Sequence, residues 1–175
     1  MSKNISIAIV IFAVLIIQIS FIEPFVVGIA PISVVVLFLT LLAFRLELIP
    51  LLWWSFLIGA LHEVYSIMPF GTFIVITIIT SIVLYYLLKN LLTNKSLLPF
   101  VLMAITGSII YNLLFFAASV LFYYTNSLTI TIYQIPHLWS GILVQAGVNG
   151  ISALILFLLL RTLTKRFQNQ FLVRK

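Results

Sequence analysis

Long apolar runs, separated by short polar or turn-forming stretches, make up almost the whole chain. A helix needs about 20 residues, at about 1.5 Å each, to cross the roughly 30 Å hydrocarbon core of a bilayer. Six runs come near that length and leave no room for a soluble domain: residues 5–22, 25–44, 48–67, 70–88, 97–124 and 136–160. The pattern therefore predicts a single all-α integral membrane domain over residues 1–175, built as a six-helix transmembrane bundle.

The second and third runs are the least regular of the six. Arg45 and Glu47 separate them, Pro31 interrupts the second, and Pro50 lies near the start of the third. Backbone groups freed by a proline are tolerated at membrane depth only where protein or water covers them. We therefore expect these two runs either as tilted full spans or as a shorter hairpin shielded by the other helices.

The first run follows Met1-Ser-Lys3-Asn, which resembles the start of a signal peptide. The run covers residues 5–22, longer than the usual apolar core of a signal peptide, and no small-x-small cleavage site follows it. We therefore expect a retained first span.

Composition indicates that lipid is the main surrounding of this chain. Of its 175 residues, 64% are hydrophobic and 7% are charged, whereas soluble domains average about 45–50% apolar and about a quarter charged residues. The net charge of +6 does not indicate nucleic-acid binding, because the basic residues lie at the ends of apolar runs and form no basic face. The absence of cysteine excludes disulfides, thiolate metal sites and cysteine nucleophiles.

Charge placement tests the number of spans independently of hydropathy. With six spans and the N-terminus inside, all nine basic residues fall on the inner side: Lys3, Arg45, Lys89, Lys95, Arg161, Lys165, Arg166, Arg174 and Lys175. The outer loops hold Glu23, Glu63 and His137, and no Lys or Arg. Because short cytoplasmic loops retain Lys and Arg, we expect both termini in the cytoplasm, with residues 161–175 as a basic tail.

One stretch, residues 57–71, gathers the residue types that are rare elsewhere in the chain. A histidine, an acid, two glycines and a proline crowd the end of an apolar run: Gly59, His62, Glu63, Pro69 and Gly71. An acid within a membrane span is costly unless it is paired, and it then marks a candidate functional site. Glu63 lies near the expected outer end of its span, so a structural polar contact and a role in a pocket or partner surface both stay open.

This stretch lacks the partners that catalysis requires. His62-Glu63 begins like the zinc-protease helix motif, but Ser66 stands where the second histidine is needed. The chain contains no Asp, no Gly-x-Ser-x-Gly and no paired acids for general acid–base chemistry. We therefore expect no enzymatic activity, no metal site and no cofactor.

A polar face on the sixth run is the second candidate feature. Small and polar residues recur there at intervals of three or four, which places them on one side of a helix: His137, Gly141, Gln145, Asn149 and Ser152. The fifth run offers a matching set in Ala104, Ser108 and Asn112, and Gly147 and Gly150 add a second surface for close approach. In lipid such residues usually pack helices together. Helix packing, a lined ligand cavity and a docking face for another membrane protein all stay open.

Three segments carry a family pattern. The first is Ala30-Pro31-Ile32-Ser33-Val34, followed by a short predicted helix that ends at Ala43-Phe44-Arg45. The second has Gly59, Glu63 and Ser66 before Pro69-Phe70-Gly71, and the third runs from Asn149 to Arg161. This pattern resembles the MreD family of bacterial rod shape-determining membrane proteins. That family has a Gly-x-x-x-Asp helix end, a small polar residue, a Pro-x-Gly opening and a final helix with an Asn that ends in Leu and Arg. Glu63 stands where the family usually has Asp, which keeps the charge and lengthens its reach.

The resemblance implies a non-enzymatic scaffold of the cell-elongation machinery in the bacterial inner membrane, where it supports peptidoglycan synthesis. It implies binding to a single-span shape protein of the MreC type, and through it to other elongation proteins. Glu63 and the turn from Gly59 to Gly71 would then shape an outer pocket or docking surface. The alternative is a substrate-binding subunit of an energy-coupling vitamin transporter, which is also a small six-span protein. The first run lacks the small-residue motif expected there, and few polar groups converge on a pocket, so the scaffold is favoured.

Overall fold

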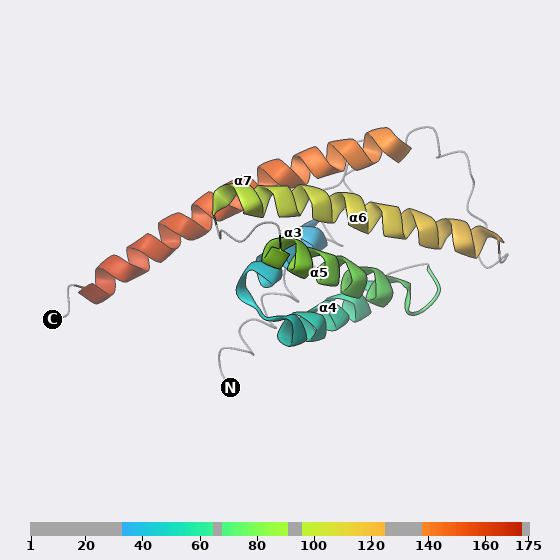
Figure 1. Ribbon diagram of the computed structural model, residues 1–175, viewed down its shortest axis with the longest axis horizontal. Helices are drawn as coiled ribbons and strands as arrows, with labels where there is room; N and C mark the ends of the chain where they lie inside the picture. Colours follow the sequence, from blue (N-terminus) through green and yellow to red (C-terminus); the bar gives the residue numbers. More distant parts are fainter. Residues whose placement is uncertain (1–32, 65–67, 91–95, 125–137, 173–175) are drawn as a thin grey trace.

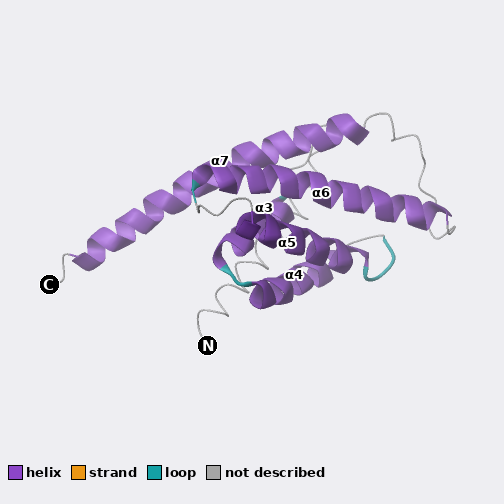
Figure 2. Ribbon diagram, viewed as in Figure 1, coloured by secondary structure: helices purple, strands orange, loops and turns teal. Residues whose placement is uncertain are grey.

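The computed structural model describes residues 33–64, 68–90, 96–124 and 138–172. Within these ranges the chain forms five helices and no strands: α3 (Val34–Arg45), α4 (Leu48–Glu63), α5 (Thr72–Asn90), α6 (Leu97–Tyr124) and α7 (Leu138–Leu172) (Figures 1 and 2). The predicted all-α class is confirmed for these residues. The predicted first span at residues 5–22, residues 25–32 of the second, and His137 lie outside them.

Three of the described helices are long and apolar enough to cross a membrane, over Thr72–Asn90, Leu97–Phe122 and Trp139–Leu159. The other two are shorter, since α3 has 12 residues and α4 has 16. At about 1.5 Å per residue they reach about 18 and 24 Å, less than the roughly 30 Å hydrocarbon core. The described residues therefore contain three of the six predicted spans at nearly full length, and the described parts of the second and third runs form shorter helices.

Local signals explain the bounds of the short hairpin. Ser33 has an extended backbone, and its Oγ accepts a hydrogen bond from Val36 N (3.4 Å), so it caps the start of α3. The chain leaves α3 through Leu46 and Glu47, which both have extended backbones. Pro50 lies in the first turn of α4, where a missing N–H breaks no helical hydrogen bond, so it does not interrupt the helix.

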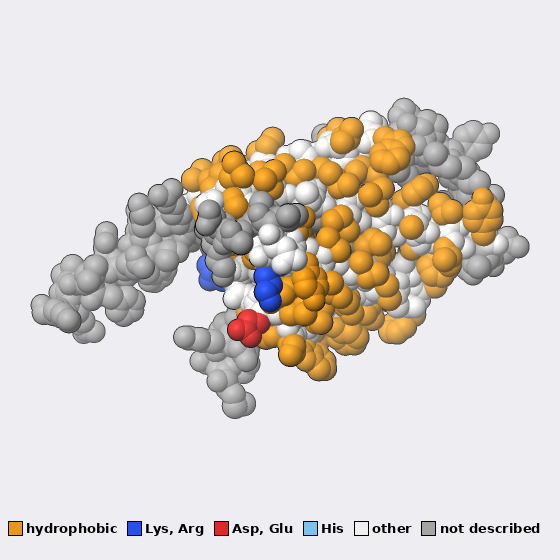
Figure 3. All heavy atoms as spheres, viewed as in Figure 1, with side chains coloured by type: hydrophobic (Ala, Val, Ile, Leu, Met, Phe, Trp, Pro, Cys, Tyr) orange, Lys and Arg blue, Asp and Glu red, His pale blue; other side chains and the backbone are white. Residues whose placement is uncertain are grey.

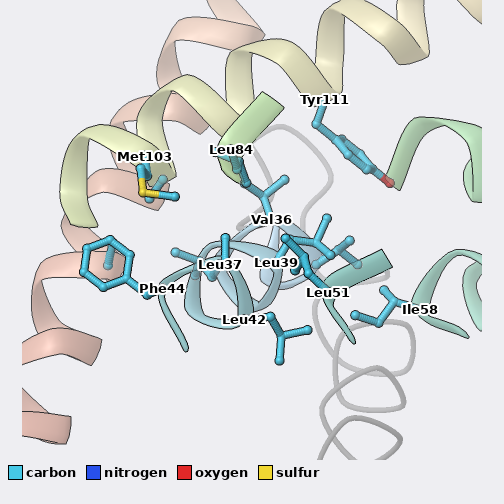
Figure 4. Packing of buried hydrophobic residues seen from close by; sticks show 14 of the residues in the cluster. Val36, Leu37, Leu39, Leu42, Phe44, Leu51, Ile58, Leu84, Met103 and Tyr111 are labelled. Carbon is cyan, nitrogen blue, oxygen red and sulfur yellow. The ribbon is translucent and has the colours of Figure 1, made fainter. Parts of the chain in front are cut away.

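The shortest helix, α3, lies at the centre of the structure. It contacts α4, α5, α6 and α7, and its side chains are buried on almost every side (Figure 4). Val36 and Leu39 are fully buried, and the ring of Phe44 packs edge-on against Phe100 of α6, with centroids 5.1 Å apart. A helix that is apolar all round must be covered by protein or lipid, and here the longer helices cover it.

The outer surface of the described helices is largely apolar. Figure 3 shows hydrophobic side chains over most of the viewed face, with the visible charged side chains gathered towards one end. Arg45 at the end of α3, Glu47 before α4 and Lys89 at the end of α5 are all exposed. An apolar surface with charges at one end is the arrangement expected of helices embedded in lipid.

The last helix continues beyond its predicted span. The sequence pattern places the end of the sixth span near residue 160, followed by a basic tail, whereas α7 runs without a break to Leu172. No Gly or Pro occurs between Arg161 and Leu172, so no residue there terminates the helix. The first part of the tail is therefore a helical extension of the span.

Candidate functional site

The turn between α4 and α5 brings together the five residues predicted at residues 57–71, and we call this place the Glu63 corner: Gly59, His62, Glu63, Pro69 and Gly71. The carbonyl of Pro69 accepts hydrogen bonds from Thr72 Oγ1 (2.6 Å) and Thr72 N (3.3 Å), which fixes the entry into α5. Gly71 has a φ of +98°, a backbone conformation that favours glycine. The Pro-x-Gly sequence therefore builds a defined turn.

The carboxylate of Glu63 caps the N-terminus of α5. Its Oε2 accepts hydrogen bonds from the backbone N–H groups of Phe73 (2.9 Å) and Ile74 (3.3 Å). These are among the first N–H groups of a helix, which have no partner within the helix and carry its positive partial charge. Glu63 is only 7% exposed. The buried acid therefore has a structural partner across the turn.

The second oxygen of the same carboxylate is different. Glu63 Oε1 is buried and accepts no hydrogen bond from any described residue. A buried acceptor without a partner lowers stability, and native structures contain few of them. The described residues therefore leave this buried oxygen without a hydrogen-bond donor.

His62 takes part in aromatic packing that joins three helices. Its ring lies against Phe73 of α5, with centroids 4.3 Å apart, and Phe73 lies 5.8 Å from Phe115 of α6. His62 Nδ1 is 3.4 Å from the hydroxyl of Tyr111 on α6. Among the described residues, no three His, Cys, Asp or Glu side chains gather in a way that could hold a metal ion. His62 thus anchors the corner to α6.

The polar face of α7 meets the matching residues of α6. Asn149 is fully buried, its Nδ2 donates to Ser108 Oγ (2.6 Å), and its Oδ1 accepts from the backbone N–H of Ser33 (3.0 Å). Ser108 in turn donates to the carbonyl of Ala104 (2.7 Å). One amide therefore ties α7 to α6 and to the start of α3.

A pair of amide side chains lies one turn further along the interface between α6 and α7, which we call the α6–α7 seam. Asn112 Nδ2 donates to Gln145 Oε1 (2.5 Å) and to the carbonyl of Ser108 (2.7 Å). Gln145 is 9% exposed, and Asn112 is half-buried. Amide side chains that bond between helices stabilise packing in lipid, so these four polar residues hold α6 and α7 together.

Other residues of the predicted face on α7 lie outside this network. No described atom lies within 4 Å of a Cβ added at Gly141, nor at Gly147, and both glycines are exposed. A Cβ at Gly150 would lie 2.9 Å from Ile105 Cγ1 of α6, and Ser152 is half-buried. The helices approach closely near Gly150 and diverge towards the Leu138 end of α7 (Figure 1), so no other described helix packs closely on Gly141 or Gly147, and their predicted packing role stays a prediction.

The sequence analysis missed a set of hydroxyls between α4 and α5. Ser55 Oγ lies 2.6 Å from Ser81 Oγ, and Thr77 Oγ1 lies 3.0 Å from the carbonyl of Ser55. A Cβ at Gly59 would lie 2.7 Å from Ile74 Cα and would also collide with Thr77 Oγ1. The signal was present, because Ser55 and Gly59, like Thr77 and Ser81, are small residues spaced by four, as at many membrane helix interfaces.

Comparisons of this chain with protein-family models, with curated proteins and with solved structures found no match. The fold and site define the class directly: an all-helical protein, in its described part, with three helices that are long and apolar enough to span a membrane. This class indicates a membrane protein, and the family resemblance stays an expectation drawn from the sequence.

Proposed function

We propose that this protein is a non-enzymatic scaffold of the bacterial cell-elongation complex, which supports peptidoglycan synthesis by binding a single-span shape protein of the MreC type. The observation that carries the proposal is the build of the Glu63 corner. Its turn is fixed by Pro69 and Gly71, its acid is held against α5, and Phe70 within the turn is exposed. A fixed turn that presents an exposed aromatic side chain suits docking better than catalysis.

Exposed apolar side chains lie next to the Glu63 corner in sequence. Val64 follows Glu63 at the end of α4 and is 75% exposed, and Phe70, just before Gly71, is 87% exposed. Large aromatic side chains often supply much of the binding energy at interfaces. We infer that the partner covers Phe70 and Val64 with an apolar surface. The charge placement along the chain puts this corner on the outer side of the membrane.

A depression on the described helices favours the scaffold over the vitamin-binding alternative. It is a shallow hollow on the surface of α4, lined by Ile49, Leu52, Trp53 and Phe56. A small-molecule site needs a few convergent polar groups to orient its ligand, and all four lining side chains are predominantly apolar. This hollow therefore suits a lipid chain or an apolar helix better than a polar vitamin.

Co-purification from native bacterial membranes tests the proposal. The tagged chain is expected to recover a single-span shape protein together with elongation proteins, and Phe70→Ala is expected to reduce that recovery. Ile79→Ala removes an exposed apolar side chain of α5 away from the corner and serves as the matched control. Recovery of transport ATPases, or of a vitamin bound to the purified chain, would contradict the scaffold and support the transporter subunit.

A further inference from the structure

The amide pair at the α6–α7 seam has hydrogen-bonding groups that the seam itself does not use. Asn112 Nδ2 donates hydrogen bonds to Ser108 O and to Gln145 Oε1. The hydrogen bonds between α6 and α7 use neither Gln145 Nε2 nor Asn112 Oδ1. Gln145 is nonetheless nine-tenths buried, in the apolar window Trp139–Leu159. The hydrocarbon core offers no water to such groups, so their partner must come from protein.

Open space lies next to this pair. Gly141 precedes Gln145 by four residues, so it lies on the same side of α7 and one turn closer to the Leu138 end. No described atom comes within 4 Å of a Cβ placed there. Leu113 and Val144, the neighbours of the two amides in sequence, are exposed. A second protein surface can therefore reach the amides and pack on apolar side chains around them.

We propose that this seam binds a second copy of the chain, with Gln145 Nε2 of each copy donating a hydrogen bond to Asn112 Oδ1 of the other. The pair offers both a donor and an acceptor, so it is complementary to itself. Copies inserted with the same topology are related by a two-fold axis along the membrane normal, which keeps each residue at the same depth. Asn112 and Gln145 already bond to each other, so they lie at one depth and meet their counterparts across the axis.

This self-association is independent of the proposed scaffold function, because it uses a different surface from the Glu63 corner. It makes Gly141 a contact residue between copies, which explains a glycine with no close neighbour on the other described helices. A glycine in a helix otherwise lowers stability relative to alanine. Small residues at such positions let helix backbones approach closely in lipid.

The test uses the full chain in lipid nanodiscs or detergent, with subunit number counted by single-molecule photobleaching. We expect a dimer in the wild type. Gly141→Leu should leave the fold intact, since the described residues leave open space around it, and should convert the dimer to a monomer. Gly147→Leu is the matched control: its site is equally open but lies on the opposite side of α7 from Gln145, so the dimer should persist.

Two further variants test the amides and the contact itself. Gln145→Met, which keeps the length and removes the amide, should weaken dimerisation about tenfold, because two symmetry-related hydrogen bonds are lost. Because the chain has no cysteine, Gly141→Cys introduces its only thiol, and oxidation should yield a covalent dimer. A wild-type monomer at every protein-to-lipid ratio would overturn the proposal. So would equal effects of Gly141→Leu and Gly147→Leu, which would indicate association through another surface.

Discussion

At the scale of single residues, Glu63 shows how a buried acid can stabilise the start of a neighbouring helix. Its carboxylate lies at the N-terminus of α5, where backbone N–H groups have no partner within the helix, and Oε2 accepts hydrogen bonds from two of them. Negative groups at helix N-termini stabilise by about 0.3–1 kcal/mol at exposed sites and up to about 2 kcal/mol when partly buried. The sequence left a structural contact and a partner contact as alternatives, and the hydrogen bonds of Oε2 are a structural contact.

The cap makes a direct prediction about stability. Glu63→Ala removes both hydrogen bonds and leaves two buried N–H groups without partners, so we expect a loss of about 2 kcal/mol in the free energy of unfolding. Glu63→Gln keeps an acceptor and loses only the charge, so about 1 kcal/mol or less is expected. Thermal unfolding in detergent measures both. Glu47→Gln is the control, because Glu47 is exposed and its side chain caps nothing. An unchanged Glu63→Ala variant would show that the cap does not stabilise the fold.

At the scale of helices, the close pair α4 and α5 rests on Gly59. A methyl group there would meet the backbone of α5 at 2.7 Å, and neither backbone can move without separating Ser55 from Ser81. Glycine is therefore required by packing at this position, whereas at Gly71 it is favoured by backbone conformation. The two glycines of the Glu63 corner thus act through different physical causes.

Gly59→Ala is expected to destabilise the protein by about 1–3 kcal/mol, the usual cost of forcing extra atoms into a packed interface. Urea unfolding, or loss of folded protein on heating in detergent, measures the change. Gly147→Ala is the matched control in α7, where open space and better helix propensity predict no loss and a gain of about 0.5–1 kcal/mol. Equal changes in stability for Gly59→Ala and Gly147→Ala would contradict a packing requirement for glycine at position 59.

The long helices were predictable from the sequence and the short ones were not. The fifth run matches α6 from Leu97 to Tyr124. A mostly apolar run of 28 residues between polar stretches is too long for a strand, so it predicts a membrane-spanning helix. The length of the helix in the second run was not predictable, since an apolar sequence does not distinguish a helix surrounded by lipid from one surrounded by other helices. The burial of α3 by four neighbours decides the matter, and that is a property of the tertiary structure.

The same division holds for the polar seam. The spacing of four placed Ser108 with Asn112 and Gln145 with Asn149 on facing helix sides, and the structure pairs them. The bond from Ser33 N to Asn149 joins residues 116 positions apart, and no periodic pattern predicts it. The open surroundings of Gly141 depend on how far two helices diverge, which spacing also does not reveal.

At the scale of the whole molecule, Asn149 links the central helix to the long pair. Asn149→Ala should lower the free energy of unfolding by about 2–4 kcal/mol, because it removes two buried hydrogen bonds and leaves Ser33 N and Ser108 Oγ short of a partner. Thr106→Val is the control, since its hydroxyl bonds only to carbonyls of its own helix. Differential scanning in detergent compares them, and a loss for Asn149→Ala no larger than for Thr106→Val would remove this residue from the core.

Topology can be tested at the same scale. The nine basic residues predict both termini in the cytoplasm. A reporter fused after Lys175 should therefore be active on the cytoplasmic side, and one inserted at residues 125–135 should be external. An external C-terminal reporter would reverse the placement of the Glu63 corner.

If the Glu63 corner docks a single-span protein, the purified chain should bind one directly. The most direct measurement is the dissociation constant between the purified chain and a single-span shape protein of the MreC type, both in nanodiscs. We expect saturable binding that Phe70→Ala weakens about thirtyfold, the effect of losing an interface residue worth about 2 kcal/mol, and that Ile79→Ala leaves unchanged. Absence of binding, or equal affinities for the wild type and Phe70→Ala, would contradict docking at the Glu63 corner.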